Sequence, residues 1–189
     1  MWPAAQMLCG TRVTLFPLTQ SHAAGLSLAS MGPKHLPANC RVPTVDALEG
    51  EISYLREQHA DGRGLFFAVS DHNEFLRGIT GFSRIDRAHK QLEIGGTWLQ
   101  GSDHLMFTEM TTMMLTYAFE CARAVTVQMR VPAQDHAHRL ILSDLGAGLD
   151  GVLRGAKIDR AGQPVDMAVY SVIATEWATT RSALLSKLL

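Results

Sequence analysis

A chain of 189 residues with 47% hydrophobic content can bury one sizeable core and leaves little room for a second domain. Its formal net charge of −1 and pI of about 6.7 show no excess of positive charge that would attract nucleic acid or an anionic membrane. Neither is therefore a predicted partner. The longest charge-free apolar run, near Met110–Phe119, is about half the length that a transmembrane helix needs.

The N-terminal residues and the cysteines bear on the cellular compartment. Residues Met1–Ala5 lack the basic segment and the long apolar core of a secretory signal peptide. The three cysteines, Cys9, Cys40 and Cys121, are odd in number, widely separated and without metal-ligand spacing. We therefore expect reduced thiols in a cytoplasmic protein.

Hydrophobic periodicity predicts a mixed α/β sheet in one domain that spans residues 1–189. Thr11–Leu18 alternates like a strand, whereas Val45–His59 has apolar residues at helical spacing after Thr44, a candidate N-cap. Met31–Pro43 carries three prolines and no period, so we expect a loop beside the substrate mouth. The predicted elements, in chain order, are a strand over Thr11–Leu18, helices over His22–Ser30 and Val45–His59, strands over Leu65–Ser70, Phe75–Ile85 and Gln91–Leu99, a helix over Met106–Cys121, a strand over Ala124–Val131, a helix over Asp135–Leu145, a hairpin of Leu149–Ile158 with Pro164–Ile173, and a helix over Thr175–Leu189.

A short loop, Gln100–Leu105, joins the predicted strand Gln91–Leu99 to the predicted helix Met106–Cys121. At a helix N-terminus the unpaired backbone N–H groups and the positive end of the helix dipole converge. A strand, a short loop and a helix start in this order therefore predict an anion site.

A resemblance to a known family is carried, in a fixed order and spacing, by Leu8–Leu18, Glu93–Gly95 with Thr97–Leu99, Leu145–Ala147, Asp150–Arg154, Tyr170–Ser171 and Glu176–Trp177. Between about Leu8 and Trp177 the chain resembles the GNAT N-acetyltransferases, and within them the subgroup that acetylates ribosomal-protein N-termini and related amines. The resemblance implies a single GNAT-like α/β domain with a mixed twisted sheet of about seven strands and flanking helices. It also implies a splayed gap in the sheet at Trp98–Leu99, beside the strand Ala124–Val131. It also implies acetyl-CoA as the cofactor and a small-molecule or peptide amine as the substrate.

The same resemblance assigns roles to residues at the family's site positions. Glu93 is the candidate base that accepts the proton of the amine, through a water. His138 stands where the family has a serine near the sulfur, and an imidazole can donate a proton to a thiolate near neutral pH. The implied catalytic residues are Glu93, His138 and Tyr170, and the implied cofactor-binding residues are Trp98, Leu99, Gln100, Gly101, Ser102, Asp103, His104, Leu105 and Asp135.

Each catalytic candidate also has a purely structural interpretation. Glu93 can face solvent or pair with Arg84 on the neighbouring strand, and Tyr170 can be a core tyrosine with its hydroxyl in water. Asp135 can be an N-cap with His138 a half-exposed surface residue. No metal site is expected, because His138 and the histidine two positions before it point about 200° apart on a regular helix.

The cofactor loop departs from the family pattern Gln/Arg-x-x-Gly-x-Gly/Ala. Gln100 is retained, but Asp103 and Leu105 occupy the positions of the two small residues, which let backbone N–H groups approach a phosphate. Three functions therefore stay open. The chain is an acetyl-CoA-dependent N-acetyltransferase with an altered loop, a catalytically silent GNAT fold without cofactor that binds a protein or small molecule, or a transferase for a different acyl donor.

The predicted C-terminal helix presents an apolar stripe in a chain of nearly zero net charge. Part of this stripe should pack on the sheet, and any remainder should favour a homodimer. The stripe consists of Trp177, Leu184, Leu185, Leu188 and Leu189.

The substitution Asp103→Gly tests whether the loop is an impaired phosphate grip. We expect acetyl-CoA binding to strengthen by up to about 3 kcal/mol, roughly a hundredfold, because a carboxylate about 5 Å from a phosphate costs that much at an effective dielectric near 20. The gain, measured by calorimetry, should be larger at low salt and nearly absent for donors without the pyrophosphate. A double variant that also carries Leu105→Gly and binds no better than the parent would contradict this interpretation.

Overall fold

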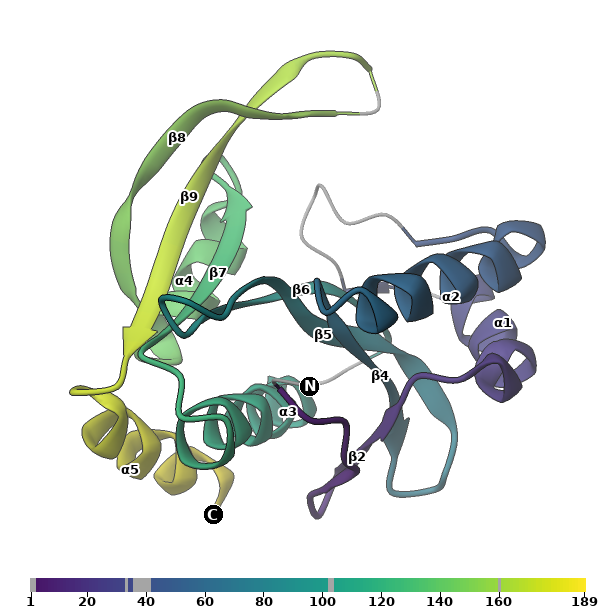
Figure 1. Cartoon of the computed structure of the whole chain (residues 1–189), viewed down its shortest axis with the longest axis horizontal. Coiled ribbons are helices and arrows are strands. Elements are labelled where there is room, and N and C mark those ends of the chain that lie inside the picture. Colours follow the sequence, from purple (N-terminus) through teal and green to yellow (C-terminus); the bar gives the residue numbers. More distant parts are fainter. Residues whose placement is uncertain (1–2, 33, 36–41, 102–103, 160) are drawn as a thin grey trace.

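The computed structural model describes residues 3–32, 34–35, 42–101, 104–159 and 161–189. Ser102, Asp103 and most of the predicted Met31–Pro43 loop lie outside this part of the chain. Within it, helices flank one mixed, twisted sheet, as Figure 1 shows. The strands are β1 (Leu8–Cys9), β2 (Val13–Pro17), β3 (Lys34–His35), β4 (Leu65–Asp71), β5 (Leu76–Asp86), β6 (Gln91–Gln100), β7 (Thr126–Pro132), β8 (Gly148–Ile158) and β9 (Pro164–Ile173). The α-helices are α1 (Ala23–Met31), α2 (Val45–Ala60), α3 (His104–Thr116), α4 (His136–Asp144) and α5 (Trp177–Leu188).

The sheet confirms the predicted fold class. Its order is β1-β2-β4-β5-β6-β7-β9-β8, with β3 paired to the end of β6. The seven longer strands match the predicted number. The sheet also contains two short strands, β1 and β3, of two residues each. Every described pair of neighbours is antiparallel except β6 with β7, which run parallel. The parallel pair lies in the middle of the sheet, where the two halves of the molecule meet.

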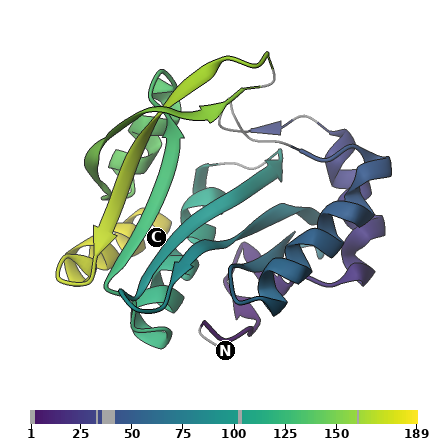
Figure 2. The same cartoon turned by 45° about the horizontal axis from the view of Figure 1, so that its top comes forward.

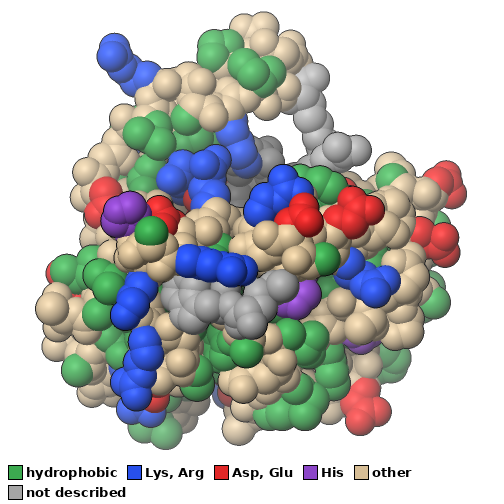
Figure 3. All heavy atoms as spheres, in the orientation of Figure 1, with side chains coloured by type: hydrophobic (Ala, Val, Ile, Leu, Met, Phe, Trp, Pro, Cys, Tyr) green, Lys and Arg blue, Asp and Glu red, His purple; other side chains and the backbone are tan. Residues whose placement is uncertain are grey.

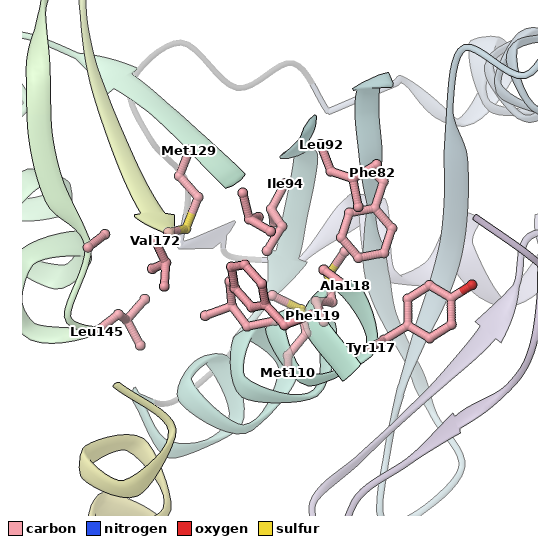
Figure 4. Close-up of a cluster of buried hydrophobic side chains, with 14 of the residues drawn as sticks. Phe82, Leu92, Ile94, Met110, Tyr117, Ala118, Phe119, Met129, Leu145 and Val172 are labelled. Atoms are coloured by element: carbon pink, nitrogen blue, oxygen red, sulfur yellow. The ribbon is translucent and has the colours of Figure 1, made fainter. Parts of the chain in front are cut away.

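Two hydrophobic clusters cover the two faces of the sheet, and β4 shows how alternation builds both. Phe67 belongs to the cluster under α3, α4 and α5, whereas its neighbour Phe66 belongs to the cluster under α1 and α2. Because successive strand residues point to opposite faces, β4 is buried along its whole length. Figure 4 shows the first cluster, in which Met110 from α3, Ile94 from β6 and Met129 from β7 converge.

Helix α3 is fixed to the start of the sheet by a buried carboxylate. Glu109 Oε1 accepts from the Thr11 backbone N–H (2.9 Å) and the Thr11 hydroxyl (2.6 Å). Its other oxygen accepts from the backbone N–H groups of Arg12 (2.7 Å) and Val13 (3.1 Å). A Cβ at Gly10 would lie 2.7 Å from Met113 Sδ and 2.9 Å from the Glu109 carboxyl carbon, so these side chains would have to shift to admit a larger residue. The contact orients the helix whose first two residues, His104 and Leu105, are the last two of the predicted cofactor loop.

Helix boundaries agree with the sequence to within a few residues, with two physical differences. The predicted helix Met106–Cys121 starts earlier, at His104, and its last turn, Tyr117–Cys121, is a π-helix. Thr44 is the N-cap of α2, but its side chain makes no capping hydrogen bond. Among the described residues, no helix is long and apolar enough to cross a membrane.

The C-terminal stripe divides as expected between core and surface. Trp177 and Leu184 are buried, and the Trp177 ring stacks on Phe119 at 5.2 Å. Its indole N–H donates to Glu120 Oε1 (3.0 Å). Leu185 is exposed. A homodimer through the exposed part stays a prediction.

Replacing Glu109 should destabilise the protein in a pH-dependent way. Burial raises the pKa of Glu109, but hydrogen bonds from Thr11, Arg12 and Val13 outweigh it, so the net pKa lies below its ordinary value of 4.5. The carboxylate therefore stabilises the fold fully above about pH 4.5, and this stabilisation is lost as the pH falls through the lowered pKa. We expect Glu109→Gln to cost about 2 kcal/mol of unfolding free energy at pH 7, measured by urea denaturation. The cost should shrink below pH 4.5, and a constant difference down to pH 3 would contradict this role.

Candidate active site

A cleft opens between β6 and β7 and passes from one face of the sheet to the other. The β6–β7 ladder pairs Gln91–Ile94 with Thr126–Met129 and then stops. Beyond it lies a cavity of about 680 Å³. On the α2 face its walls include Leu55, Arg84, Glu93, Trp98, Arg130 and Lys157. On the α3 face they include Leu99, His104, Phe107, Met110, His138 and Ile141.

A bulge in β6 produces this opening. From Gly81↔Gly95 to Ile79↔Trp98, β6 advances three residues while β5 advances two, so β6 carries one extra residue. Gly96 lies in this step with φ +65°, in the left-handed region that favours glycine. The extra residue reverses the side-chain parity, so that Trp98 packs with the α1/α2 cluster and Leu99 with the α3 cluster. The predicted gap at Trp98–Leu99 is present and begins at Gly95.

Glu93 lies in the wall of the cleft between two arginines. Its carboxylate oxygen Oε2 is 3.2 Å from Arg84 Nε and 3.0 Å from Arg130 Nε. The Glu93 side chain is 13% exposed, and that of Arg130 22%. The hairpin of β8 (Gly148–Ile158) and β9 (Pro164–Ile173) forms an arm, here called the β8–β9 arm. Figure 3 shows Lys and Arg side chains gathered below this arm, with Asp and Glu side chains nearby. Of the two structural alternatives for Glu93, the structure shows the pairing with Arg84, and this pairing coexists with a position in the cleft wall.

The surroundings of Glu93 favour a carboxyl group that holds a proton more readily than usual. Burial raises its pKa above the ordinary 4.5, and the charges of Arg130, Arg84 and Lys157 oppose this without cancelling it. A raised pKa brings a carboxylate closer to neutral pH, where general bases work best. Glu93 thus combines burial, access to the cleft and a basicity suited to proton transfer.

His138 faces the cleft from α4, with Asp135 behind it. Asp135 is the N-cap of α4, and its Oδ1 accepts from the His138 backbone N–H (3.2 Å). Its second oxygen lies 2.9 Å from His138 Nδ1. The N-cap interpretation of Asp135 is confirmed, and the same carboxylate also contacts the imidazole. His138 is 23% exposed and lies on the opposite side of the opening from Glu93.

The predicted cofactor loop begins at the end of β6. Gly101 has φ +54°, in the left-handed region that favours glycine, and a Cβ there would meet no other described residue within 4 Å. His104 starts α3 and lines the cleft, whereas Leu105 is 37% exposed. The Gln100 side chain packs on Gly32, where a Cβ would collide with its amide nitrogen. Ser102 and Asp103, which the resemblance assigns to the cofactor loop, lie outside the residues that the structure describes.

Tyr170 occupies a different place from the other candidates. It is buried on β9, and its hydroxyl accepts a hydrogen bond from Arg139 Nε (3.1 Å) rather than pointing into water. Among the described residues, it is not part of the cleft wall. Nor do any three described His, Cys, Asp or Glu residues form a group that could hold a metal ion.

Two cations of the cleft were not identified from the sequence. Arg130 lies on β7 between the buried Met129 and Val131, so it points to the other face, beside Glu93. Its place on the polar face of this strand, with Thr126 and Gln128, was the available signal. Lys157 comes from the distant hairpin, and no local pattern marks it.

The comparisons with known proteins place the chain in a family. The model of the acetyltransferase (GNAT) domain matches residues 12–147. The chain belongs to the GNAT family. No curated protein sequence matches this GNAT chain.

Solved structures share its fold over nearly the whole length. A GCN5-related N-acetyltransferase from Brucella melitensis has 23% identity and a TM-score of 0.86, covering 99% of this chain and 87% of its own. RimJ from Mycobacterium smegmatis, in complex with CoA-disulfide, has 19% identity and a TM-score of 0.78, covering 98% and 95%. RimL, a ribosomal L7/L12 alpha-N-protein acetyltransferase, has 14% identity and a TM-score of 0.75, covering 89% and 94%. At these identities the likeness shows the GNAT fold, including that of ribosomal-protein acetyltransferases.

Substituting Gly96 should destabilise this GNAT domain through the backbone. A Cβ at Gly96 would meet the Phe66 ring at 3.4 Å, an ordinary contact, so the cost arises from the left-handed φ. We expect Gly96→Ala to lower the unfolding free energy by about 1–2 kcal/mol, measured by urea denaturation. Gly50→Ala is the control, because its Cβ meets nothing within 4 Å in helix α2 and should stabilise by about 0.5–1 kcal/mol. A stabilising Gly96→Ala would contradict the bulge.

Proposed function

We propose that the protein is an acetyl-CoA-dependent N-acetyltransferase that acts on a primary amine, with Glu93 as the base. The observation that carries the proposal is Glu93 itself. It is a buried carboxyl group with a raised pKa in the wall of a cleft that crosses the sheet. Family membership supports the acetyl transfer, and this geometry supports the assignment of the base.

The residues present fit acetyl-CoA. When bound, it supplies an acetyl group activated as a thioester. Among the described residues, β7 pairs with β6 only up to Ile94, and β3 pairs with Leu99 and Gln100, so the intervening edge of β6 faces the cleft. The backbone of this edge, including Trp98, would hold the pantetheine arm. The first turn of α3 and the turn at Gly101 would lie against the pyrophosphate.

The two sides of the cleft can divide the proton transfers. On the α2 face Glu93 accepts the proton that the amine loses as its nitrogen bonds to the acetyl carbon, directly or through one water. On the α3 face His138 would donate a proton to the leaving sulfur, with an Asp135 carboxylate oxygen 2.9 Å from its Nδ1. Backbone N–H groups on the open edge of β6 would stabilise the negative charge on the acetyl oxygen. In this arrangement Glu93 would accept the amine proton and His138 would donate the proton to the sulfur, so that each transfer uses a separate group.

The substitution Glu93→Gln tests the base. We expect it to lower kcat with an amine acceptor by about 10²–10⁴-fold, measured as CoA release. The parent should lose kcat/KM as the pH falls through the raised pKa of Glu93, because only the ionised carboxylate accepts a proton. That acid limb should lie above pH 4.5 and disappear in Glu93→Gln.

The matched control is Glu120→Gln, which removes a carboxylate that pairs with Arg181 and does not line the described cleft. It should keep the acid limb of the pH profile. An unchanged kcat in Glu93→Gln would show that Glu93 is not the base. A parent whose melting temperature does not rise with acetyl-CoA would favour the silent fold.

A further inference from the structure

We propose that the amine acceptor carries a carboxylate a few bonds from its amine, and that Arg84, Arg130 and Lys157 bind this group. The inference rests on the proposed function, because it names the substrate class of the same cleft. Its basis is an excess of positive charge around Glu93 and two buried atoms, Glu93 Oε2 and Arg130 Nε, that have no hydrogen-bond partner among the described residues.

Positive charge exceeds negative charge on the α2 face of the cleft. Three cations line the wall, namely Arg84, Arg130 and Lys157, against two carboxylates, Glu51 and Glu93. Glu93 is shared by both arginines through one oxygen. The partly enclosed, largely apolar cleft strengthens the attraction of the remaining charge for an anion.

The contact between Glu93 and Arg130 is incomplete as a hydrogen bond. Glu93 Oε2 and Arg130 Nε lie 3.0 Å apart, yet neither of these fully buried atoms has an aligned hydrogen-bond partner among the described residues. Arg130 does donate from Nη2 to Gln128 Oε1 (3.1 Å), a neutral acceptor. Buried polar atoms are normally satisfied, so a ligand oxygen that accepts from the guanidinium would supply a charged partner for Arg130.

The β8–β9 arm brings the third cation to the site. Between Leu153↔Met167 and Lys157↔Val165, β8 advances four residues while β9 advances two, so β8 contains a bulge. Gly155 lies in it with φ +57°, and its N–H donates to Asp166 Oδ1 (2.7 Å). Figures 1 and 2 show the arm curving back over the sheet. Lys157 thereby lines the cleft and lies near enough for its charge to lower the pKa of Glu93.

The position of the cations limits the distance between the amine and the carboxylate. Both arginines contact the group that takes the amine's proton, so the bound carboxylate must lie beside the reacting nitrogen. Two sources satisfy this spacing. One is the α-carboxylate of a free amino acid, and the other is an acidic side chain near the N-terminus of a peptide.

The test compares matched acceptors that differ in one charge. Peptides Ala-Asp-Ala-Ala-amide and Ala-Asn-Ala-Ala-amide form one pair, and alanine and alaninamide form the other. The parent enzyme should show at least a tenfold higher kcat/KM for the charged member of one pair, mainly through KM, and the pair that shows it identifies the source. Added salt should raise that KM.

Lys157→Gln is the informative variant, because Lys157 makes no direct ion pair with Glu93 among the described residues. It should reduce the charged-to-neutral ratio of kcat/KM about tenfold. Arg63→Gln removes one positive charge from an exposed pair with Asp61, outside the described cleft wall, and should leave the ratio unchanged.

Two outcomes separate this inference from the proposed function. Equal use of both members of both pairs by the parent would overturn the inference and leave the acetyltransferase assignment intact. If no acceptor is acetylated, calorimetry with the Asp peptide and alanine decides the matter. Binding that weakens in Lys157→Gln supports the carboxylate site without the activity, and absence of binding to both overturns the site.

Discussion

The end of the parallel β6–β7 ladder at Ile94 and Met129 is the constraint on which the site depends. A continuous ladder would place backbone against backbone and close the sheet. The extra residue at the Gly96 bulge turns β6 away from β7 and also reverses which face its side chains take. One glycine in a left-handed conformation therefore opens the cleft and carries the β6 chain to the loop before α3.

The electrostatics of Glu93 follow from that opening. A carboxyl group on a strand beside a cleft is removed from bulk water, which raises its pKa, yet it lies where cations from β5, β7 and β8 meet. The cations stabilise the ionised form of the Glu93 carboxyl group, whereas burial raises its pKa. In the proposed function, the same balance would let Glu93 accept a proton and hold two guanidinium groups in place for a ligand.

Local sequence patterns predicted most of the fold, because alternation and helical spacing are properties of short segments. The strand Pro164–Ile173 has the predicted boundaries, and Asp135 is the predicted N-cap. Adjacent antiparallel strands also made the Glu93–Arg84 pair predictable. The family resemblance placed the gap near Trp98, although the bulge that causes it has no signal beyond Gly95-Gly96.

Other parts of the site depend on contacts between distant segments. Arg130 meets Glu93 only through the parallel register of β7, and Lys157 only through the bulge in β8. Tyr170 was expected to place its hydroxyl in water, but Arg139, from a helix 31 residues earlier, donates to it. Periodicity predicts which face of a strand or helix a residue occupies, but it does not predict which residue from a distant segment contacts it.

Hydrogen exchange of the full chain, with and without acetyl-CoA, tests most directly whether the β6–β7 cleft is the site of acetyl transfer. The backbone amides of residues 95–98 and of the first turn of α3 should exchange more slowly when acetyl-CoA is bound, because the ligand would cover the open edge of β6. The hairpin Asp71–Leu76, on the far side of β5, should show no change. Protection confined to segments outside the cleft, at saturating acetyl-CoA, would contradict the assignment.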